Sequence, residues 1–449
     1  MSNAWADDLF ERIRARTVGV AVIGLGYVGL PMAVEFAKAG AKTVGVDVDQ
    51  EKIERINRGE SYILDVKAEE LAHLNAQGLL RATADYAALK EADAIFICVP
   101  TPYTKMKAPD LSYVEDASRG LAAHLRPGQL VVLQSTTYPG TTEEVVLPLL
   151  ESSGLKVGRD FFLAFSPERI DPGNKEYGAR NTPKVVGGID EASTRLASAL
   201  FELFIEPGKI HQVSTPKVAE MTKLLENIFR SVNIALVNEL AKLSDRMGID
   251  IWEVLDAAAT KPFGFMPFYP GPGVGGHCIP VDPYYLSWKA REYDFYTKFI
   301  ELAAEVNQSM PFYTANKVIE ALNRHGKPLL GSRILVLGAT FKKDIDDARN
   351  SPTVEILKIL LAHGAQASYH DPYVPRITFN EPVMGPVGER VLESIPLSEG
   401  FLEGMDCTLI AVAHSCFDIP WIVRHSRLIV DAQNATKGIR EGRERIVRL

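Results

Sequence analysis

Short apolar runs alternate with longer segments of helical period in both the N-terminal and C-terminal parts of the chain. The strand-like runs of the N-terminal part are TVGVAVIG (17–24), TVGVDV (43–48), AIFICVP (94–100), LVVLQS (130–135), FFLAFS (161–166) and KVVGG (184–188). A second series begins at RILVLGAT (333–340) and continues through CTLIAVA (407–413) and RLIVDA (427–432). Such alternation is typical of parallel sheets that helices cover on both faces. The pattern predicts an α/β protein with two Rossmann-like, doubly wound parallel-sheet domains.

The middle of the chain has a helical pattern. Ser214, Thr215 and Pro216 form a helix-start signal, and Gly248 is a plausible stop. Between them an apolar stripe recurs at helical spacing, formed by Met221, Leu224, Leu225, Ile228 and Val232. We expect a long central helix and a helical middle domain, with domain boundaries at 1–213, 214–312 and 313–449. The stripe favours a homodimer or higher homo-oligomer, although one chain could also bury it internally.

Composition narrows the class of protein. A chain of 449 residues with 46% hydrophobic and 24% charged residues is expected to fold into two or three domains. The net charge of -8, without a block of Lys and Arg, argues against nucleic acid or a membrane surface as partner. The four cysteines are scattered and lack disulfide or zinc spacing, so we expect no metal and a reducing cytoplasm. The N-terminus lacks a signal-peptide pattern, and no apolar run is long enough to span a bilayer.

The turn GLGYVG (24–29) has G-x-G-x-x-G spacing between a predicted strand and a predicted helix. In such turns Gly24 makes the tight turn, Gly26 lets a pyrophosphate approach the backbone, and Gly29 lets helix and strand pack closely. Asp47 ends the second predicted strand, where this fold places a carboxylate on the adenine ribose. A carboxylate there repels a 2′-phosphate, so we predict NAD rather than NADP. The alternative is a glycine turn with an unrelated aspartate.

Polar residues gather at further positions. Lys223 and Asn227 are four residues apart and share one face of the predicted central helix. The segments SPERIDPG (166–173), STTYPG (135–140) and FKKDIDDARNSP (341–352) each follow a predicted strand, at the edge where open parallel sheets bind ligands. Each alone also fits a solvated helix face, a helix cap or an ordinary turn. Beside a nucleotide fingerprint they indicate hydride transfer on an anionic substrate, which needs a base, an oxyanion stabiliser and cations.

The segment GPGVGGHCIPVDP (271–283) places Cys278 behind a run of glycines and four residues ahead of Asp282. This segment is typical either of a tightly packed loop or of a thiol in a glycine-lined pocket. Taken in order with GLGYVG, STTYPGTT, SPERIDPG, KLLEN and FKKDIDDARNSPT, it makes the chain from about Val18 to Lys437 resemble the UDP-glucose/GDP-mannose dehydrogenase family. An ordered set of motifs of this length is highly specific.

The resemblance implies a site. The family's catalytic cysteine corresponds to Cys278, and further catalytic roles fall on Lys223, Asn227, Asp282, Glu168 and Thr136. Expected NAD contacts are Gly24, Gly26, Tyr27, Val28, Gly29, Asp47, Lys52, Pro100, Thr101, Ser135, Thr136 and Arg349. Expected contacts with a UDP-sugar are Glu168, Arg169, Ile170, Lys223, Asn227, Tyr269, Gly273, Phe341 and Lys342. The three domains would then serve NAD binding, dimerisation and nucleotide-sugar binding, in that order.

The cysteine is explained by a double oxidation. Hydride transfer from the sugar's primary alcohol needs only a base, whereas a second oxidation becomes possible when a thiolate adds to the aldehyde. The thiohemiacetal is then oxidised to a thioester, and the thioester is hydrolysed to the acid. Lys223 would stabilise the thiolate and the oxyanions, Asp282 would hold Lys223 or a water, and Glu168 would activate the hydrolytic water.

Three positions depart from the UDP-glucose-type pattern. Pro172 stands where those members have a second glutamate, with Asp171 as the nearest carboxylate, and Gln433 stands where an arginine is usual. The segment 259–270 lacks the arginine that reaches a neighbouring subunit. The motifs resemble the branch that acts on UDP-N-acetylhexosamines, and UDP-N-acetylglucosamine is the favoured substrate. UDP-N-acetylmannosamine, UDP-N-acetylgalactosamine and UDP-glucose remain alternatives, as do a β-hydroxyacid dehydrogenase and a non-catalytic NAD sensor.

Overall fold

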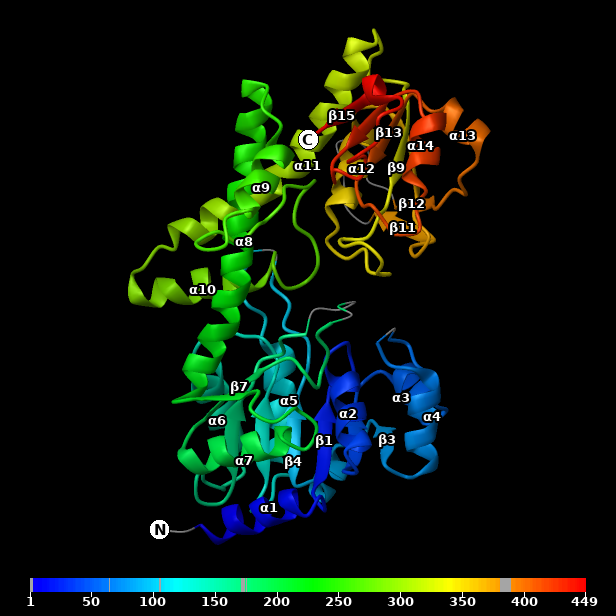
Figure 1. Ribbon diagram of the computed structural model, residues 1–449. Coiled ribbons are helices and arrows are strands. Elements are labelled where there is room, and N and C mark those ends of the chain that lie inside the picture. The colour runs from blue at the N-terminus through cyan, green and yellow to red at the C-terminus, as the bar shows by residue number, and fades with distance from the viewer. Residues whose placement is uncertain (1–2, 64, 105, 171–173, 175, 380–388) are drawn as a thin grey trace. The chain divides into compact units, whose positions relative to one another are not determined.

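The computed structural model describes residues 3–63, 65–104, 106–170, 174, 176–379 and 389–449 (Figure 1). The chain forms two compact units, each built around one large sheet. The first unit comprises Met1–Glu226 and Tyr284–Phe295, and the second comprises Asn227–Pro283 and Tyr296–Leu449. The boundaries expected at 213 and 312 stay predictions. Within the described residues, no helix combines the length and the apolar character needed to cross a membrane.

The sheet of the first unit has eight strands in the order β3-β2-β1-β4-β5-β6-β7-β8. In the described residues only the β6–β7 pair is antiparallel. The strands are β1 (Gly19–Ile23), β2 (Lys42–Val46), β3 (Leu80–Thr83), β4 (Ala94–Ile97), β5 (Leu130–Leu133), β6 (Phe162–Phe165), β7 (Lys184–Gly188) and β8 (Ile210–Val213). All six runs predicted as strands in this part of the chain are confirmed.

Successive residues of β1 enter different cores. Val20 and Val22 belong to one cluster of buried residues, and Ala21 and Ile23 belong to another. A strand points alternate side chains to opposite faces, so the sheet is buried on both faces, as a doubly wound sheet must be. The covering helices and helical turns are α1 (Ala4–Arg14), α2 (Gly29–Lys38), α3 (Gln50–Asn57), α4 (Ala68–Ala76), η1 (Tyr86–Glu91), α5 (Ser112–Ala122), η2 (Thr142–Val146), α6 (Leu147–Glu151) and α7 (Glu191–Phe201).

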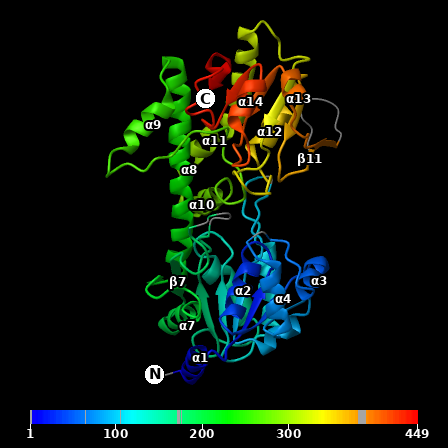
Figure 2. The same cartoon turned by 45° about the vertical axis from the view of Figure 1, so that its right-hand side comes forward.

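The central helix α8 runs from Pro216 to Met247 and is continuous in both views (Figures 1 and 2). The Thr215 hydroxyl accepts from the Val218 N–H at its start, and Gly248 ends it with a φ of 69°. The predicted start and stop are therefore confirmed. The predicted stripe spreads over two faces, because Leu224 is fully buried while Met221 is exposed. The remaining helices of the middle region are α9 (Ile251–Ala259), α10 (Asp282–Ala290), η3 (Arg291–Tyr293) and α11 (Lys298–Arg324).

The second unit contains a five-stranded parallel sheet in the order β10-β9-β13-β14-β15. Ile334 and Val336 of β9 enter one core and Leu335 and Leu337 the other, so this sheet is also buried on both faces. Its strands are β9 (Arg333–Leu337), β10 (Gln366–His370), β13 (Cys407–Ile410), β14 (Ile429–Asp431) and β15 (Ile446–Arg448), with a hairpin of β11 (Arg376–Phe379) and β12 (Arg390–Glu393) and the helices α12 (Pro352–Ala362), α13 (Glu399–Gly404), α14 (Ile419–His425) and η4 (Arg443–Arg445). The predicted fold class is confirmed.

Candidate active site

In the glycine turn after β1, each of the three glycines is required for a different structural reason. Gly24 has a φ of 91°, and a Cβ there would lie 2.7 Å from the Cys98 carbonyl oxygen. A Cβ on Gly29 would lie 1.9 Å from the Gly24 carbonyl oxygen, so only glycine lets α2 pack this closely. A Cβ on Gly26 would meet nothing within 4 Å, which leaves this stretch of backbone open to a ligand. These properties fit the pyrophosphate of a dinucleotide.

The start of α2 supports the same fit. Among the described residues no side chain caps this helix, whose N-cap position is Val28. Backbone N–H groups at an uncapped helix start favour an anionic group. Tyr27, directly before the N-cap, is 43% exposed and therefore lies where a bound nucleotide can reach it.

Asp47 follows β2 beside the glycine turn. Its Oδ2 accepts from the Leu25 N–H at 2.7 Å, and its Oδ1 accepts from the Asp49 N–H at 2.9 Å. The Lys52 ammonium lies 3.8 Å from Oδ2, and the Tyr62 hydroxyl donates to the Leu25 carbonyl oxygen at 2.5 Å. A carboxylate offers about four acceptor positions, so these contacts leave capacity for ribose hydroxyls. Asp47 is thus oriented next to the glycine turn, and its carboxylate can still accept hydrogen bonds from a bound nucleotide.

The ends of β4 and β5 are tied together. The Ser135 hydroxyl donates to the Val99 carbonyl oxygen at 2.7 Å, and Thr136 beside it is half-buried. The backbone after Pro100 is held by Tyr285 of α10, whose hydroxyl donates to the Thr101 carbonyl oxygen. These residues lie at the carboxyl edge of the sheet, where open α/β folds bind ligands.

Glu168 is held by four donors at the end of β6. Its Oε1 accepts from the N–H groups of Arg169 and Ile170 at 2.8 and 2.9 Å, and its Oε2 accepts from Gln134 and Lys184 at 2.7 and 2.8 Å. Burial alone would raise the pKa of Glu168, but Lys184 and the hydrogen bonds hold it below its ordinary value. Glu168 is therefore ionised and firmly oriented, which makes it a weak proton acceptor in this arrangement.

Arg169 points its guanidinium to the first turns of α8. Its Nη2 lies 2.7 Å from a Glu226 oxygen, and its Nη1 donates to the Pro183 carbonyl oxygen at 2.7 Å. Lys223, one turn earlier on α8, is only 9% exposed, so it is not part of a solvated helix face. A buried cation at a ligand-binding edge fits the role expected of Lys223.

A residue that sequence reasoning missed anchors α8. Glu220 is fully buried and accepts from the Gly140 N–H at 2.5 Å and from the Thr142 N–H and hydroxyl at 2.9 and 2.7 Å. Burial raises the pKa of Glu220. It joins α8 to the STTYPGTT segment that carries Ser135 and Thr136. A glutamate one turn before Lys223 gives no local signal of this contact.

In the second unit, Asn227, Cys278 and Asp282 come together. The Asn227 amide donates to the Asp282 carboxylate at 2.5 Å. The Asp282 N–H donates to the Cys278 carbonyl oxygen at 2.8 Å, at the start of α10. Asp282 is 3% exposed, and Cys278 is half-buried. The cysteine, the aspartate and the asparagine predicted as catalytic are therefore neighbours.

The glycine-rich segment before Cys278 lies against the segment 341–352. A Cβ on Gly275 would lie 2.6 Å from Cβ of Phe341, and one on Gly276 would lie 3.0 Å from the Phe341 ring. The Gly276 N–H donates to the Arg349 carbonyl oxygen at 3.2 Å, and Asn350 donates to the Gly276 carbonyl oxygen at 3.0 Å. Gly273 has a φ of 138°. Only glycine permits this packing.

The remaining predicted contacts lie in the second unit. Arg349 donates to both carboxylate oxygens of Asp347, and the shortest of these contacts is 2.6 Å. Burial would raise the pKa of Asp347, but the bonds from Arg349 hold this pKa below its ordinary value. Tyr269 stacks on Trp252 with a ring-centroid distance of 6.1 Å. Lys342 is half-buried. Asp171 and Pro172, which bear on the substrate branch, lie outside the described residues.

Family models match successive parts of the chain. Three models of the UDP-glucose/GDP-mannose dehydrogenase family match: its NAD binding domain over residues 18–205, its central domain over 217–309 and its UDP binding domain over 335–438. The chain is 40% identical over 400 residues to a UDP-N-acetyl-D-glucosamine 6-dehydrogenase of Pseudomonas aeruginosa, covering 89% of this chain and 91% of the relative.

Two further relatives carry other sugars in their names. An NDP-N-acetyl-D-galactosaminuronic acid dehydrogenase of Ralstonia nicotianae is 37% identical over 356 residues, covering 76% of this chain and 80% of the relative. The solved structure of a UDP-D-ManNAc dehydrogenase from Pyrococcus horikoshii matches with a TM-score of 0.84 at 34% identity, covering 96% of this chain and 98% of that one. The chain belongs to the UDP-glucose/GDP-mannose dehydrogenase family and is an NAD-dependent nucleotide-sugar dehydrogenase.

Proposed function

We propose that the protein oxidises the C6 alcohol of a UDP-sugar to the uronic acid in a four-electron reaction, with UDP-N-acetylglucosamine as its substrate. The observation that carries this proposal is the placement of Cys278 in one turn with Asp282, whose carboxylate is bound by Asn227. A single alcohol oxidation has no use for a thiol, whereas oxidation of the aldehyde to an acid does.

Cys278 would supply the covalent step. Its thiolate adds to the aldehyde carbon to give a thiohemiacetal, and loss of a hydride from that carbon gives a thioester, which water hydrolyses. Lys223, a buried cation, would stabilise the thiolate and the oxyanion of each tetrahedral species. Asp282 and Asn227 would provide fixed polar groups near the thiol, because the hydrogen bond between them orients both side chains.

Glu168 is the proposed water-activating group. Its lowered pKa and four donors make it a weak base as it stands, so activation would require release of a donor from one oxygen. Without such release Glu168 would instead fix the backbone of Arg169 and Ile170, both expected at the substrate. The Lys184 contact, which sequence reasoning did not identify, holds Glu168 in its present orientation.

The first unit would hold NAD. Gly24, Gly26 and Gly29 would receive the pyrophosphate with Tyr27 and Val28, and Asp47 with Lys52 would face the adenine ribose. Pro100, Thr101, Ser135 and Thr136 would line the nicotinamide end, and Arg349 is a further proposed cofactor contact. When bound, NAD accepts the hydride in each oxidation. The residues of the chain bind and orient the cofactor.

The sugar preference rests on similarity and on one departure. A relative with 40% identity is named for UDP-N-acetyl-D-glucosamine, while other relatives are named for other N-acetylhexosamines. Gln433, in place of the arginine of UDP-glucose-type members, has its amide nitrogen 3.3 Å from the position of a Cβ on Gly271. A neutral amide beside the glycine-rich segment suits a substrate that itself carries an amide.

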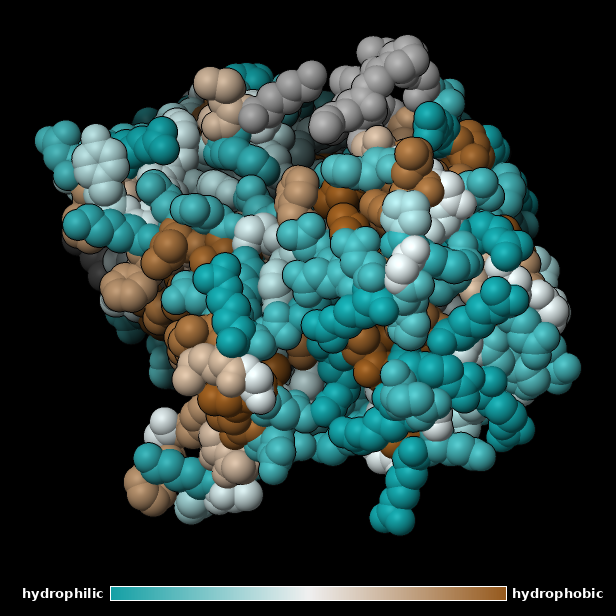
Figure 3. All heavy atoms as spheres, turned by 90° about the horizontal axis from the view of Figure 1, so that it is seen from above, coloured by the Kyte–Doolittle hydropathy of each residue, from teal (hydrophilic) through white to brown (hydrophobic). Residues whose placement is uncertain are grey.

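The protein would act as a homodimer through α8. Exposed apolar side chains follow this helix at steps of three, four or seven residues: Val218, Met221, Leu225, Phe229, Leu236, Leu240, Leu243 and Met247. Such spacing matches the seam between paired helices. A row of exposed apolar side chains of this kind marks an interaction site. Seen from above, hydrophobic residues also lie among the mainly hydrophilic residues of the surface (Figure 3).

A substrate panel tests the proposal. Values of kcat/KM are measured for UDP-N-acetylglucosamine, UDP-N-acetylgalactosamine, UDP-N-acetylmannosamine and UDP-glucose, with products identified by mass. UDP-N-acetylglucosamine should give the highest value and a uronic acid. If UDP-glucose is best, the branch assignment is wrong. Turnover of none of the four, with NAD still bound, would overturn the enzymatic proposal.

A further inference from the structure

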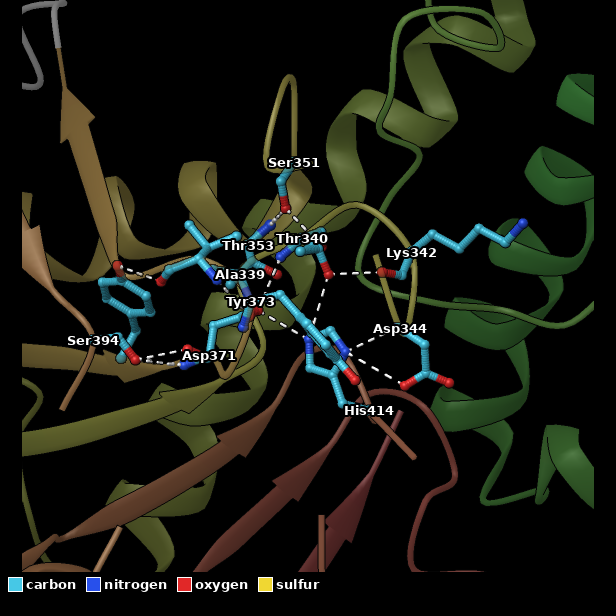
Figure 4. A network of polar contacts seen from close by, with 12 residues as sticks. Ala339, Thr340, Lys342, Asp344, Ser351, Thr353, Asp371, Tyr373, Ser394 and His414 are labelled. Atoms are coloured by element: carbon cyan, nitrogen blue, oxygen red, sulfur yellow. Dashed lines mark hydrogen bonds and ion pairs between the residues drawn. The ribbon is translucent and has the colours of Figure 1, made fainter. Parts of the chain in front are cut away.

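A buried histidine and aspartate lie behind the segment 340–344 of the second unit. His414 follows β13 and Asp371 follows β10, and both side chains are 0% exposed. The His414 Nε2 is 2.9 Å from the Asp371 Oδ2 (Figure 4). Neither residue belongs to the site proposed above. Burial of two polar side chains of this kind is costly unless both are hydrogen-bonded.

The contacts fix the tautomer of His414. The Asp344 N–H donates to Nδ1 at 2.9 Å, and a backbone N–H has no acceptor capacity. Nδ1 is therefore unprotonated, and Nε2 carries the proton that it donates to Asp371. His414 thus joins the carboxylate on one side to the backbone of the segment on the other.

Asp371 holds the beginning of the same segment. Its Oδ2 accepts from the N–H groups of Ala339 and Thr340 at 2.6 and 3.3 Å, and its Oδ1 accepts from those of Tyr373 and Val374 at 2.7 and 3.0 Å. Burial would raise the pKa of Asp371, but His414 and the backbone donors hold it below its ordinary value. The carboxylate stays ionised, as an acceptor for all five donors.

The end of the segment is held as well. Asp344 has a φ of 61°, in the left-handed region that a residue with a side chain seldom adopts. Its carboxylate accepts from the N–H and hydroxyl of Ser415 at 2.8 and 2.5 Å, next to His414. Inside the segment, the Thr340 hydroxyl donates to the Lys342 carbonyl oxygen at 2.7 Å. The conformation of 340–344 is therefore imposed from both ends.

This conformation determines where two expected substrate contacts lie. The Lys342 side chain extends away from Thr340 and His414 (Figure 4). Phe341 packs against Gly275 and Gly276, and Cys278 follows two residues later. A shift of the segment would move Lys342 and would also disturb the glycine-rich backbone that leads to the cysteine.

We infer that His414 and Asp371 form a positioning pair for the UDP-sugar, which sets the segment 340–344 and, through Phe341, the approach to Cys278. This inference rests on the proposed function, in which Phe341 and Lys342 bind substrate. It assigns a role in binding to residues that do not touch the substrate. A merely structural pair would affect stability and leave substrate affinity unchanged in the folded protein.

Two substitutions of His414 separate its two hydrogen bonds. In H414N the amide oxygen can take the place of Nδ1 and accept from the Asp344 N–H, while the contact with Asp371 is lost. In H414Q the amide nitrogen can take the place of Nε2 and donate to Asp371, while the acceptor for Asp344 is lost. Comparison of these two variants therefore distinguishes a role of His414 in holding the segment 340–344 from a general loss of packing.

The Kd for UDP is measured by calorimetry without NAD, together with KM for the UDP-sugar, KM for NAD and Tm. H414Q should raise the Kd for UDP and the KM for the UDP-sugar about tenfold, as expected for one lost buried hydrogen bond, with KM for NAD unchanged. H414N should stay within about threefold of the parent protein. H425Q, on α14, is the matched control and should change none of these values.

A folded H414Q with unaltered Kd and KM overturns the inference, and so does an equal increase in H414N. Should H414Q fail to fold, D344G decides, because glycine accepts the left-handed backbone while the contacts of the Asp344 carboxylate with Ser415 and His414 are lost. It should raise the Kd for UDP about threefold or more, and an unchanged Kd would overturn the inference. If the parent protein binds no UDP at all, the proposed function itself has failed.

Discussion

The two sheets place an aspartate at the same point and use it differently. Asp47 follows β2 and Asp371 follows β10, and each accepts a backbone N–H from the turn after the first strand of its sheet, at Leu25 and Ala339 respectively. Asp47 has one further backbone donor and a lysine at 3.8 Å. Asp371 is occupied by backbone donors and by a buried histidine.

The difference shows how one fold position serves two purposes. A carboxylate with spare acceptor capacity can select a ligand, as Asp47 is proposed to select NAD. A carboxylate that is fully engaged can only set the shape of its own domain. The first sheet then presents its glycine turn to a ligand, whereas the second sheet uses the corresponding turn to hold Phe341 and Lys342 in place.

The largest effect should come from removing the thiol of the second unit. C278A should reduce formation of the uronic acid by about a thousandfold or more, because the covalent step is lost, while the Kd for NAD stays unchanged. The assay combines product mass with NAD titration. C416A, which removes an exposed cysteine of the same unit, is the control and should behave like the parent. Acid formation by C278A at the parent rate would refute covalent catalysis.

The next effect concerns Glu168 of the first unit. K184M leaves this mostly buried carboxylate without its cation, and should lower the free energy of unfolding by about 3–5 kcal/mol at pH 7. Urea unfolding measures the loss. K156M, which breaks an exposed pair with Glu151, should have little effect.

The pH dependence has a definite sign. The pKa of Glu168 is lowered on folding, so its stabilisation is present above the unfolded-state pKa of about 4.3 and is lost as the pH falls through the folded-state value. The difference between K184M and the parent should therefore shrink below about pH 4. A difference that stays constant from pH 7 into that range would show that Lys184 does not act through the charge of Glu168.

A third and smaller effect would test the comparison of the aspartates directly. D47N should raise the ratio of kcat/KM for NADP to that for NAD by about 10- to 100-fold, because the charge that repels a 2′-phosphate is gone. D371N should leave this ratio unchanged and lower Tm instead, since an amide cannot accept from all of its donors. Equal changes of cofactor preference in both variants would remove the distinction between the two positions.

The central strands could be predicted from sequence, and the edge strands could not. The runs of β1, β4, β5, β6 and β7 are buried on both faces and read as continuous apolar segments. In the two large sheets the missed strands, β3, β8, β10 and β15, are the outer ones, and the separate hairpin strands β11 and β12 were missed as well. Edge strands expose part of their surface, so their sequences lose the apolar run that marks a buried strand.

The residues of the candidate site also fall into those that the sequence predicted and those that it missed. Motif spacing indicated Gly24 and Asp47, and the resemblance to a known family assigned roles to Cys278 and Asp282. The partners Lys184, Glu220 and His414 were missed, because their contacts join positions far apart in the chain and leave no local pattern. Asp371 had a signal in principle. Recognising β10 would have placed it where Asp47 lies in the first sheet.

The stoichiometry of the reaction tests the central claim most directly. With limiting UDP-N-acetylglucosamine, excess NAD and the parent protein, NADH is measured by absorbance and the sugar product by mass. The account predicts about two NADH per sugar consumed and a UDP-linked uronic acid as the only accumulated product, as a four-electron oxidation through one thiol requires. One NADH per sugar with an accumulated aldehyde would contradict it.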